Sequence, residues 1–164
     1  MTVEERLAGL EQRLRRAEDE LAIGRLMASY GPLVDAGDAA AVAELWSEEG
    51  EYDVDGWHMR SRADVADMVR SSAHQGLIGS GSAHFLGPVC VEVDGDNAIA
   101  VCESVVVLRN DDGRGYRVWR AGANHITLRR TPAGWRIDKR ITRALDGSSE
   151  ARGLLAAGAH GRSA

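Results

Sequence analysis

The spacing of apolar residues changes once along this chain, near residue 82, from a helical period to a strand period. Before that point, six apolar residues have helical spacing: Ile23, Leu26, Met27, Tyr30, Leu33 and Val34. They predict an amphipathic helix that covers the core and ends near Asp35. After that point, apolar and polar residues alternate in four segments, residues 89–93, 99–108, 116–129 and 135–142, which are separated by Gly-containing turns. Helices followed by a long antiparallel meander predict an α+β domain in which the sheet curls around the helices.

The first 22 residues have an apolar stripe of their own. Thr2 and Glu5 form a capping box, which predicts that a helix begins there. The stripe alternates steps of three and four and comprises Leu7, Leu10, Leu14, Ala17 and Leu21. Because such a stripe needs a partner surface, we expect residues 1–22 to be a helical extension that contacts another subunit of a homo-oligomer.

Shorter elements are predicted between the first helix and the sheet. Asp38 can cap a short helix, and Ser61 can cap a second helix that reaches about Ser72. Residues 51–59, between these two helices, have the pattern of a short hairpin. Residues 74–82 are rich in Gly and Ser and have no periodicity, so we expect a mobile loop or lid there.

Length and composition limit the class of protein. The chain has 164 residues, of which 44% are hydrophobic and 27% are charged, as in an ordinary globular domain. We expect one domain over residues 1–147, followed by a C-terminal tail over residues 148–164 whose last residues are disordered. The net charge of −5, with both signs interspersed, argues against a nucleic-acid partner. The charged, helical N-terminus resembles neither a signal peptide nor a membrane anchor, so the sequence predicts a cytoplasmic protein without a membrane partner.

No metal or cofactor site is predicted. His58, His74 and His125 have no second His or carboxylate at a spacing that would converge on a metal. The chain also lacks a glycine-rich dinucleotide motif, a phosphate-binding loop and a lysine in a Schiff-base context, so no cofactor is implied. Cys90 and Cys102 lie in predicted strands and are expected to be buried free thiols.

His84 and Asp35 are the strongest candidates for catalysis. His84 falls between the predicted loop and an apolar strand, where a side chain can reach the mouth of a pocket. Imidazole suits proton abstraction because it titrates near neutral pH, and Asp35 could orient the ring and stabilise its protonated form. The alternatives are a structural histidine at a strand end and a turn-forming aspartate at a helix end. Tyr30 lies on the buried face of the helix, where its hydroxyl could donate to a substrate oxygen or only to the backbone.

Three polar residues interrupt predicted apolar rows of the strands and could line a pocket. By strict alternation Glu103 shares a row with Ile99, Asn124 interrupts a row of the next strand, and Arg143 shares a row with Trp135. Burying Glu103 without a partner would be costly, so Arg143 is expected to pair with it if both are buried. For each of the three, a structural pair is the alternative to a catalytic role.

Three local motifs carry a resemblance to a known family. They are Tyr30-Gly-Pro-Leu-Val-Asp35-Ala-Gly-Asp38 with Leu45-Trp46 beyond it, His84-Phe85-Leu-Gly-Pro-Val-Cys-Val-Glu-Val-Asp94-Gly95-Asp96, and Ala123-Asn124-His-Ile-Thr-Leu-Arg-Arg-Thr-Pro-Ala-Gly134-Trp135-Arg-Ile-Asp-Lys-Arg140. Together with the order of elements, these motifs resemble the SnoaL-like family of the nuclear transport factor 2-like superfamily over most of residues 20–147. The resemblance implies a cone-shaped fold with a curved antiparallel sheet wrapped around the N-terminal helices. The superfamily contains dehydratases, isomerases, cyclases and proteins without catalysis, so the fold alone says little about function.

The resemblance also assigns provisional roles to residues. Scytalone dehydratase, bile-acid 7-alpha-dehydratase and hexachlorocyclohexane dehydrochlorinase are similar in having an Asp at the end of the first helix and a His at the start of a strand, which Asp35 and His84 match. The bile-acid enzyme also has a helical Tyr, matched by Tyr30. Its further carboxylate and Arg are matched only loosely by Glu103, which replaces an Asp, and by Arg143.

By this resemblance, the chain is expected to be a cofactor-independent acid–base enzyme of dehydratase, isomerase or cyclase type. Its substrate is expected to be small and apolar, cyclic or polyketide-like or steroid-like, and to bind in an enclosed pocket. Trp46 and Phe85, which belong to the quoted motifs, are then expected at the substrate pocket. Relatives form trimers or dimers, so either number is implied for the homo-oligomer. The third motif, continued to Gly147, is also similar to relatives of the small subunit of ring-hydroxylating dioxygenases. That similarity implies the alternative of a non-catalytic small-molecule-binding or assembly subunit.

Overall fold

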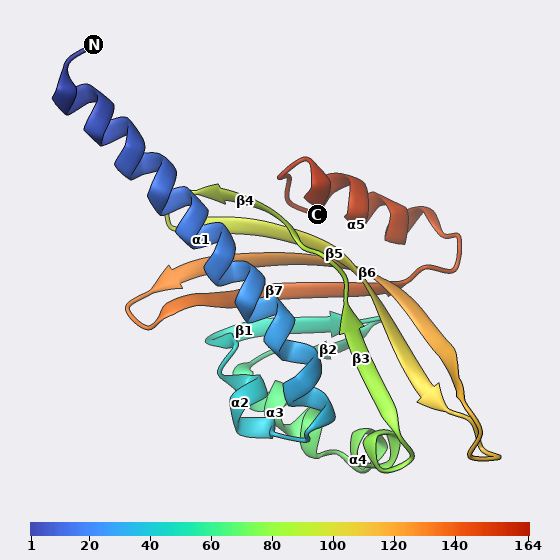
Figure 1. Ribbon diagram of the computed structural model, residues 1–164. Coiled ribbons are helices and arrows are strands. Elements are labelled where there is room, and N and C mark those ends of the chain that lie inside the picture. Colours follow the sequence, from blue (N-terminus) through green and yellow to red (C-terminus); the bar gives the residue numbers. More distant parts are fainter.

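A computed structural model describes residues 1–164 as five helices and one seven-stranded sheet. The helices are α1 (Val3–Asp35), α2 (Ala39–Ala43), α3 (Arg62–Arg70), α4 (Ser72–Gly79) and α5 (Ser149–Ala159). The strands are β1 (Trp46–Val54), β2 (Trp57–Met59), β3 (Ser82–Leu86), β4 (Cys90–Asp94), β5 (Asn97–Arg109), β6 (Tyr116–Thr131) and β7 (Gly134–Ala144). The sheet is curved and open, with the order β2-β1-β7-β6-β5-β3, and β4 also pairs with β5 (Figure 1). All pairings are antiparallel except that of β1 with β7, so the predicted α+β class is confirmed.

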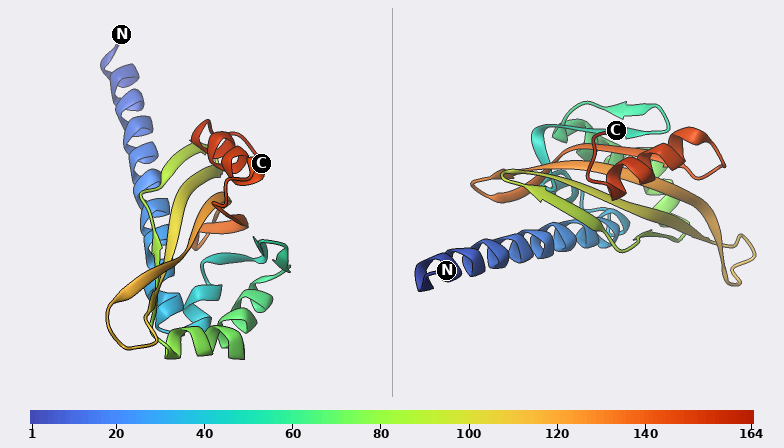
Figure 2. Two further views of the ribbon diagram at one scale, coloured as in Figure 1. Left: turned by 90° about the vertical axis from the view of Figure 1, so that its right-hand side faces the viewer. Right: turned by 90° about the horizontal axis from the view of Figure 1, so that it is seen from above.

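The two faces of the sheet are covered by different helices (Figure 2). The second half of α1 packs on one face, and α2 and α3 complete the main core beside it. The side chains with no exposed surface in this core include Ile23, Met27, Val34, Val42, Trp46, Val65, Val69, Ile126 and Ile137. The opposite face carries α5 over a smaller cluster that contains Ala123, Ala151 and Leu154. None of the five helices has a stretch both long and apolar enough to cross a membrane.

The capping box predicted for α1 is present. The backbone N–H of Glu5 donates to Thr2 Oγ1 at 3.1 Å, and the backbone N–H of Thr2 donates to Glu5 Oε2 at 2.7 Å. These two bonds satisfy backbone donors that the first helical turn leaves free. The helix then runs without a break through Gly24 to Asp35.

Strand β7 contains a one-residue bulge at Asp138 that exchanges its two faces. Consecutive residues of β6 pair with Ile137 and Lys139, so Asp138 between them has no partner in the ladder. Ile137 before the bulge and Arg140 after it therefore both face the main core, although they are three positions apart and would face opposite sides in a regular strand. Arg143 consequently points to the opposite face.

Two segments differ from the sequence predictions because a serine caps a helix in each. The expected loop over residues 74–82 is instead α4 and the start of β3, since Ser71 Oγ accepts from the backbone N–H of His74 at 3.2 Å. The expected tail over residues 148–164 contains α5, which Ser148 caps at its start. Small residues, among them the buried Gly158, let α5 lie close against the sheet.

The state of one cysteine was also predicted wrongly. Cys102 is buried on the core face of β5, as expected, but Cys90 is exposed. Cys90 begins β4, a short strand that pairs with β5 alone, and it lies opposite Val101 rather than on the core face. Both cysteines are free thiols.

Candidate functional site

Asp35 and His84 form a hydrogen-bonded pair at the junction of α1 and β3. Asp35 Oδ1 lies 2.6 Å from His84 Nδ1, and Asp35 Oδ2 accepts from the backbone N–H of His84 at 2.7 Å. Ser82 Oγ is 3.5 Å from Asp35 Oδ1 and adds a longer contact. One carboxylate thus holds both the ring and the main chain of His84. Since a carboxylate only accepts hydrogen bonds, Nδ1 carries the proton, and Nε2 of a neutral ring is an acceptor.

A glycine makes this junction possible. Gly31 lies on α1 one turn before Asp35, and a Cβ atom at its position would collide with the carbonyl oxygen of His84. The absence of a side chain therefore lets the helix approach β3 closely enough for the carboxylate of Asp35 to reach the ring.

The pair opens onto a small, mainly apolar cavity. The cavity has a volume of about 230 Å³, and 12 of its 18 lining residues are hydrophobic when the two tyrosines are included. The polar or charged lining groups belong to Tyr30, Tyr52, His74, His84, Ser104, Arg120, Arg140 and Thr142. Trp57, Phe85 and Trp119 also line it, and each is more than half exposed, so aromatic rings surround the mouth.

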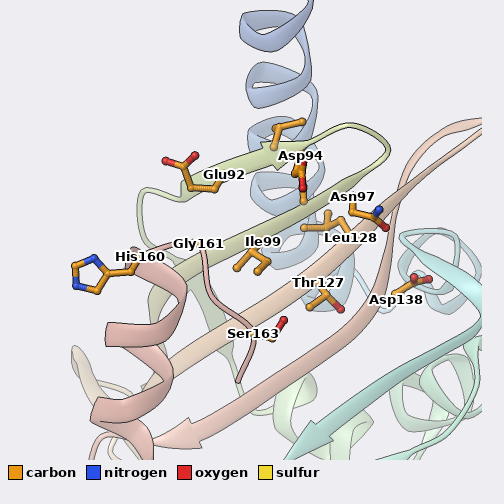
Figure 3. A pocket seen from close by; sticks show the side chains of 12 residues that line it. Glu92, Asp94, Asn97, Ile99, Thr127, Leu128, Asp138, His160, Gly161 and Ser163 are labelled. Atoms are coloured by element: carbon orange, nitrogen blue, oxygen red, sulfur yellow. The ribbon is translucent and has the colours of Figure 1, made fainter.

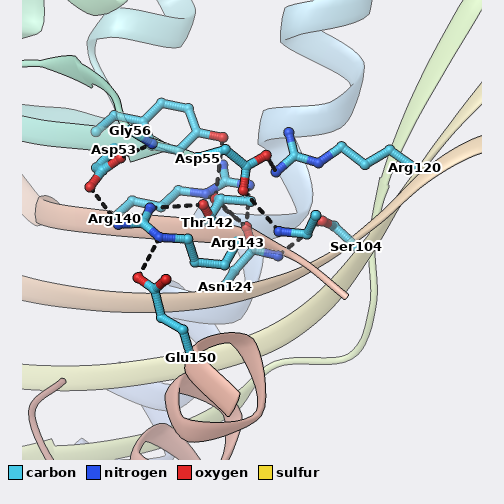
Figure 4. Close-up of polar contacts among 12 residues, drawn as sticks. Asp53, Asp55, Gly56, Ser104, Arg120, Asn124, Arg140, Thr142, Arg143 and Glu150 are labelled. Atoms are coloured by element: carbon cyan, nitrogen blue, oxygen red, sulfur yellow. Dashed lines mark hydrogen bonds and ion pairs between the residues drawn. The ribbon is translucent and has the colours of Figure 1, made fainter. Parts of the chain in front are cut away.

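Arg140 places a buried positive charge beside this cavity. Its Nε and Nη2 donate to Asn124 Oδ1 at 3.2 and 2.8 Å, and its guanidinium lies 4.4 Å from the Tyr30 ring and 4.7 Å from the Tyr52 ring (Figure 4). The side chain is 2% exposed, yet no carboxylate pairs with it and Nη1 has no hydrogen-bond partner. A buried donor without a partner is costly, so Nη1 is suited to bind an oxygen atom of a ligand.

Asn124 is the residue that orients Arg140. It does not line the cavity, but its Nδ2 donates to Ser104 Oγ at 2.9 Å and to the carbonyl of Cys102 at 3.2 Å. Thr142 Oγ1 donates to Asn124 Oδ1 at 2.8 Å, alongside the two bonds from Arg140. These contacts fix the amide orientation and, with it, the guanidinium.

His74 adds a second imidazole to the cavity wall. It is 8% exposed, and its ring centroid is 5.9 Å from that of His84. Its Nδ1 is 3.2 Å from the carbonyl of Val69, which makes Nδ1 the donor and leaves Nε2 as a buried acceptor with no partner. Burial and the neighbouring His84 lower the pKa of His74, so the ring is neutral at neutral pH.

Tyr30 supplies a neutral hydroxyl to the same cavity. Its side chain is buried, and Trp46 packs edge-on against it with ring centroids 6.0 Å apart. Burial raises the pKa of Tyr30, and Tyr52 adds to the rise. The hydroxyl therefore keeps its proton and can act as a donor.

Several residues expected at the pocket lie elsewhere. Glu103 is exposed on the face of β5 away from α1 and makes no ion pair. Arg143 does not pair with Glu103, since it donates to Asp53 and Glu150, each at 2.7 Å (Figure 4). Trp46 is fully buried beneath the aromatic cluster, so it supports Tyr30 but does not line the cavity.

Arg140 and His74 are among the cavity residues that sequence reasoning missed. Strict alternation from Trp135 puts Arg140 on the outer face of β7, and only knowledge of the bulge at Asp138 corrects this. His74 was placed in a loop because its Gly and Ser neighbours hid a helix. Ser71 followed by polar and apolar residues was the available signal for a capped helix.

A larger hollow lies beside α5 and the C-terminus (Figure 3). Its volume is about 570 Å³, and carboxylates of Glu92, Asp94 and Asp138 line it together with His160. It contains no hydrogen-bonded acid–base pair, and no group of three or more His, Cys, Asp or Glu residues in the protein is arranged to hold a metal ion. The smaller cavity at His84 is therefore the candidate site.

A comparison with protein-family models identifies the family of this domain. The model of the SnoaL-like domain matches residues 15–141, which include every residue of the cavity except Thr142. The chain belongs to the SnoaL-like domain family. A search of curated proteins gave no significant match.

Solved structures agree with this membership. A crystal structure of a nuclear transport factor 2-like protein with a cystatin-like fold from Novosphingobium aromaticivorans is 48% identical, covers 91% of this chain and 96% of its own, and has a TM-score of 0.87. A protein of unknown function from Mycobacterium tuberculosis is 25% identical over 92% of each chain, with a TM-score of 0.71. The hexachlorocyclohexane dehydrochlorinase LinA-type3 from Novosphingobium barchaimii is 18% identical, covers 81% of this chain and 90% of its own, and has a TM-score of 0.69, which shows a shared fold.

Proposed function

We propose that this SnoaL-like domain protein is a cofactor-independent acid–base enzyme that removes a proton from carbon in a small, largely apolar ligand. The observation that carries the proposal is the 2.6 Å contact between Asp35 and His84 at the wall of an apolar cavity. A base held in one tautomer by a carboxylate, with its second nitrogen free, has the arrangement that proton abstraction needs.

The residues around the cavity suit one sequence of events. His84 Nε2 accepts the proton of a C–H bond next to a carbonyl, and the electron pair of that bond forms an enolate. Asp35 stabilises the resulting imidazolium, while Arg140 Nη1 and the Tyr30 hydroxyl stabilise the negative charge on the enolate oxygen. Expulsion of a substituent from the enolate gives elimination, return of the proton to another carbon gives isomerisation, and attack on a second carbonyl gives ring closure.

The cavity also limits the class of ligand. At about 230 Å³ it is smaller than the usual range for drug-sized ligands, roughly 300–1,000 Å³, and it admits one or two rings. Arg140 requires an acceptor oxygen on the ligand, and the free Nε2 of His74 requires a donor such as a hydroxyl. A hydroxylated cyclic ketone meets both requirements. A structural neighbour is named for dehydrochlorination of hexachlorocyclohexane, which is also an elimination from a ring.

Proton exchange tests the proposal without knowledge of the complete reaction. One- and two-ring ketones, with and without a hydroxyl group, are incubated with the protein in D₂O, and deuterium incorporation next to the carbonyl is followed by NMR. We expect incorporation with the native protein and none above background with folded His84→Gln.

Equal incorporation by the variant would show that His84 is not the base. Ligand binding, detected by chemical-shift changes of the cavity residues, without exchange of any ketone would favour the non-catalytic binding alternative.

A further inference from the structure

The N-terminal part of α1 extends beyond the body of the protein (Figures 1 and 2). Leu7, Leu10, Leu14 and Leu21 are between 54% and 59% exposed, and residues 1–18 contain no buried position. Most helical stability in proteins comes from packing of an apolar face, and a row of exposed leucines is an unfavourable surface in water. This arm, residues 3–25, therefore needs a partner.

The leucines fall on one seam of a heptad repeat. Leu7, Leu14 and Leu21 occupy the first position of three successive heptads, and Leu10 and Ala17 occupy the fourth. The body holds the arm from the opposite side: Asp19 accepts from Trp135 Nε1 at 3.0 Å and from Arg130. The seam consequently stays open to solvent even where α1 has reached the sheet, as the exposure of Leu21 shows.

The residues beside the seam carry charges in a regular pattern. The positions before each first-position leucine are Arg6, Arg13 and Glu20, and the positions after each fourth-position residue are Glu11, Glu18 and Arg25. In a parallel coiled coil, each residue of the first set faces the residue five places later in the partner helix. The resulting pairs are Arg6 with Glu11, Arg13 with Glu18, and Glu20 with Arg25, and all three join opposite charges.

Five of these six charges are otherwise unused. Arg6, Glu11, Arg13, Glu18 and Arg25 make no ion pair within the chain, whereas Glu20 pairs with Arg16 at 2.9 Å. Arg16 and Asp19, on the opposite side of the arm, bind Glu92 and Arg130. An antiparallel arrangement would set members of the same set against each other. When Arg13 meets Arg13, Arg6 meets Glu20, so repulsive and attractive pairs are mixed. The parallel direction joins opposite charges in every pair, and the charge pattern therefore favours it.

We infer that the arm pairs with the arm of a second copy of this chain as a parallel, two-stranded coiled coil over residues 3–25. The charged residues on both flanks leave an apolar seam of only two positions in seven, the narrow seam typical of coiled coils. At Gly24 and beyond, the helix turns its apolar residues to the core of its own domain, so the paired region ends there.

Charge reversal tests the pairing. Arg13→Glu or Glu18→Arg alone turns two attractive pairs of the dimer into two repulsive ones, and each should weaken dimerisation by roughly tenfold or more at low salt. The double variant restores opposite charges and should return the dissociation constant to near the native value. The dissociation constants of the native protein and of all variants are measured by sedimentation equilibrium. Gln12→Glu, on the outer side of the arm, is the control that should leave the dissociation constant unchanged.

A cysteine reports the direction of the helices. In a Cys90→Ser background, Leu14→Cys should form an interchain disulfide under mild oxidation because equivalent first-position residues face each other in a parallel coil. Gln12→Cys on the outer side should not. A monomeric native protein at micromolar concentration, a dimer insensitive to either single charge reversal, or a double variant no tighter than the singles would overturn the inference.

Discussion

Replacing Asp35 with Asn should invert the proton positions on His84. The native carboxylate accepts two hydrogen bonds from this residue, one from ring Nδ1 and one from the backbone N–H. An Asn side chain has a single acceptor oxygen, so it can serve only one of these donors. The backbone N–H cannot change from donor to acceptor, whereas the ring can move its proton from Nδ1 to Nε2.

The size of the preference follows from this geometry. If the amide NH₂ faced the backbone N–H, a partly buried donor would lose its partner at a cost of about 1–3 kcal/mol. The other orientation, with the NH₂ facing Nδ1, is therefore favoured by roughly 5- to 150-fold. It places the ring proton on Nε2, the nitrogen that must accept the substrate proton in the proposed reaction. With the added loss of the carboxylate charge, proton abstraction should slow by about 10²–10⁴-fold.

The assay is ¹⁵N NMR of the His84 ring at neutral pH, combined with the rate of deuterium exchange into a ketone. We expect the proton on Nδ1 in the native protein and on Nε2 in Asp35→Asn, with a small change in the melting temperature. Ser82→Ala is the matched control, since its 3.5 Å contact with the carboxylate is long and its loss should leave the tautomer unchanged. A native ring protonated on Nε2, or an Asp35→Asn variant with the native exchange rate, would refute the reasoning.

Three further outcomes are expected. Gly31→Ala should lower the melting temperature and slow deuterium exchange, because its methyl group must push α1 away from the carbonyl of His84. Calorimetry and the exchange assay check this, and a native exchange rate would show that the close approach is unnecessary. Tyr30→Phe should slow exchange less than Asp35→Asn does, since it removes one donor but keeps the ring against Arg140; a larger loss would contradict the assigned order. His74 has a pKa below its unfolded value of 6.5, so its contribution to stability is present above that pH and is lost as the pH falls through it. Thermal denaturation between pH 7.5 and 5.5 should therefore show a smaller decrease for His74→Gln than for the native protein, and equal decreases would exclude a neutral, buried ring.

The elements predicted correctly are those with strong local signals. The capping box at Thr2, the helical face that contains Met27, and the turn at Gly95 each depend on neighbours within a few residues, and the structure contains all three elements. The parallel pairing of β1 with β7 could not be predicted, because it joins segments about ninety residues apart and nothing local encodes it.

For the candidate site, too, some features could be predicted from the sequence and others depend on tertiary packing. The proximity of Asp35 and His84 followed from a family motif, while their distance and the role of Gly31 depend on how α1 packs on β3. Arg143 was assigned to the pocket because alternation was extended through the bulge at Asp138. Glu103 was assigned because its row was expected to face the core, whereas the row that contains Val101 and Glu103 faces α5. In the structure Arg140 lies at the cavity instead, because the unpaired residue Asp138 shifts the alternation of β7 by one position.

That unpaired residue, Asp138, has a consequence for anyone who redesigns this pocket. The alternation of side chains along β7 changes at Asp138: up to Ile137 the odd-numbered side chains enter the core, and from Arg140 onward the even-numbered ones do. Deleting Asp138 would restore one regular alternation along the strand. Arg140 and Thr142 would then turn toward α5, while Ile141 and Arg143 would turn inward. Deletion of this single residue, which does not line the cavity, would thereby exchange the cation of the cavity for a different one, at a different depth and without Asn124 to hold it.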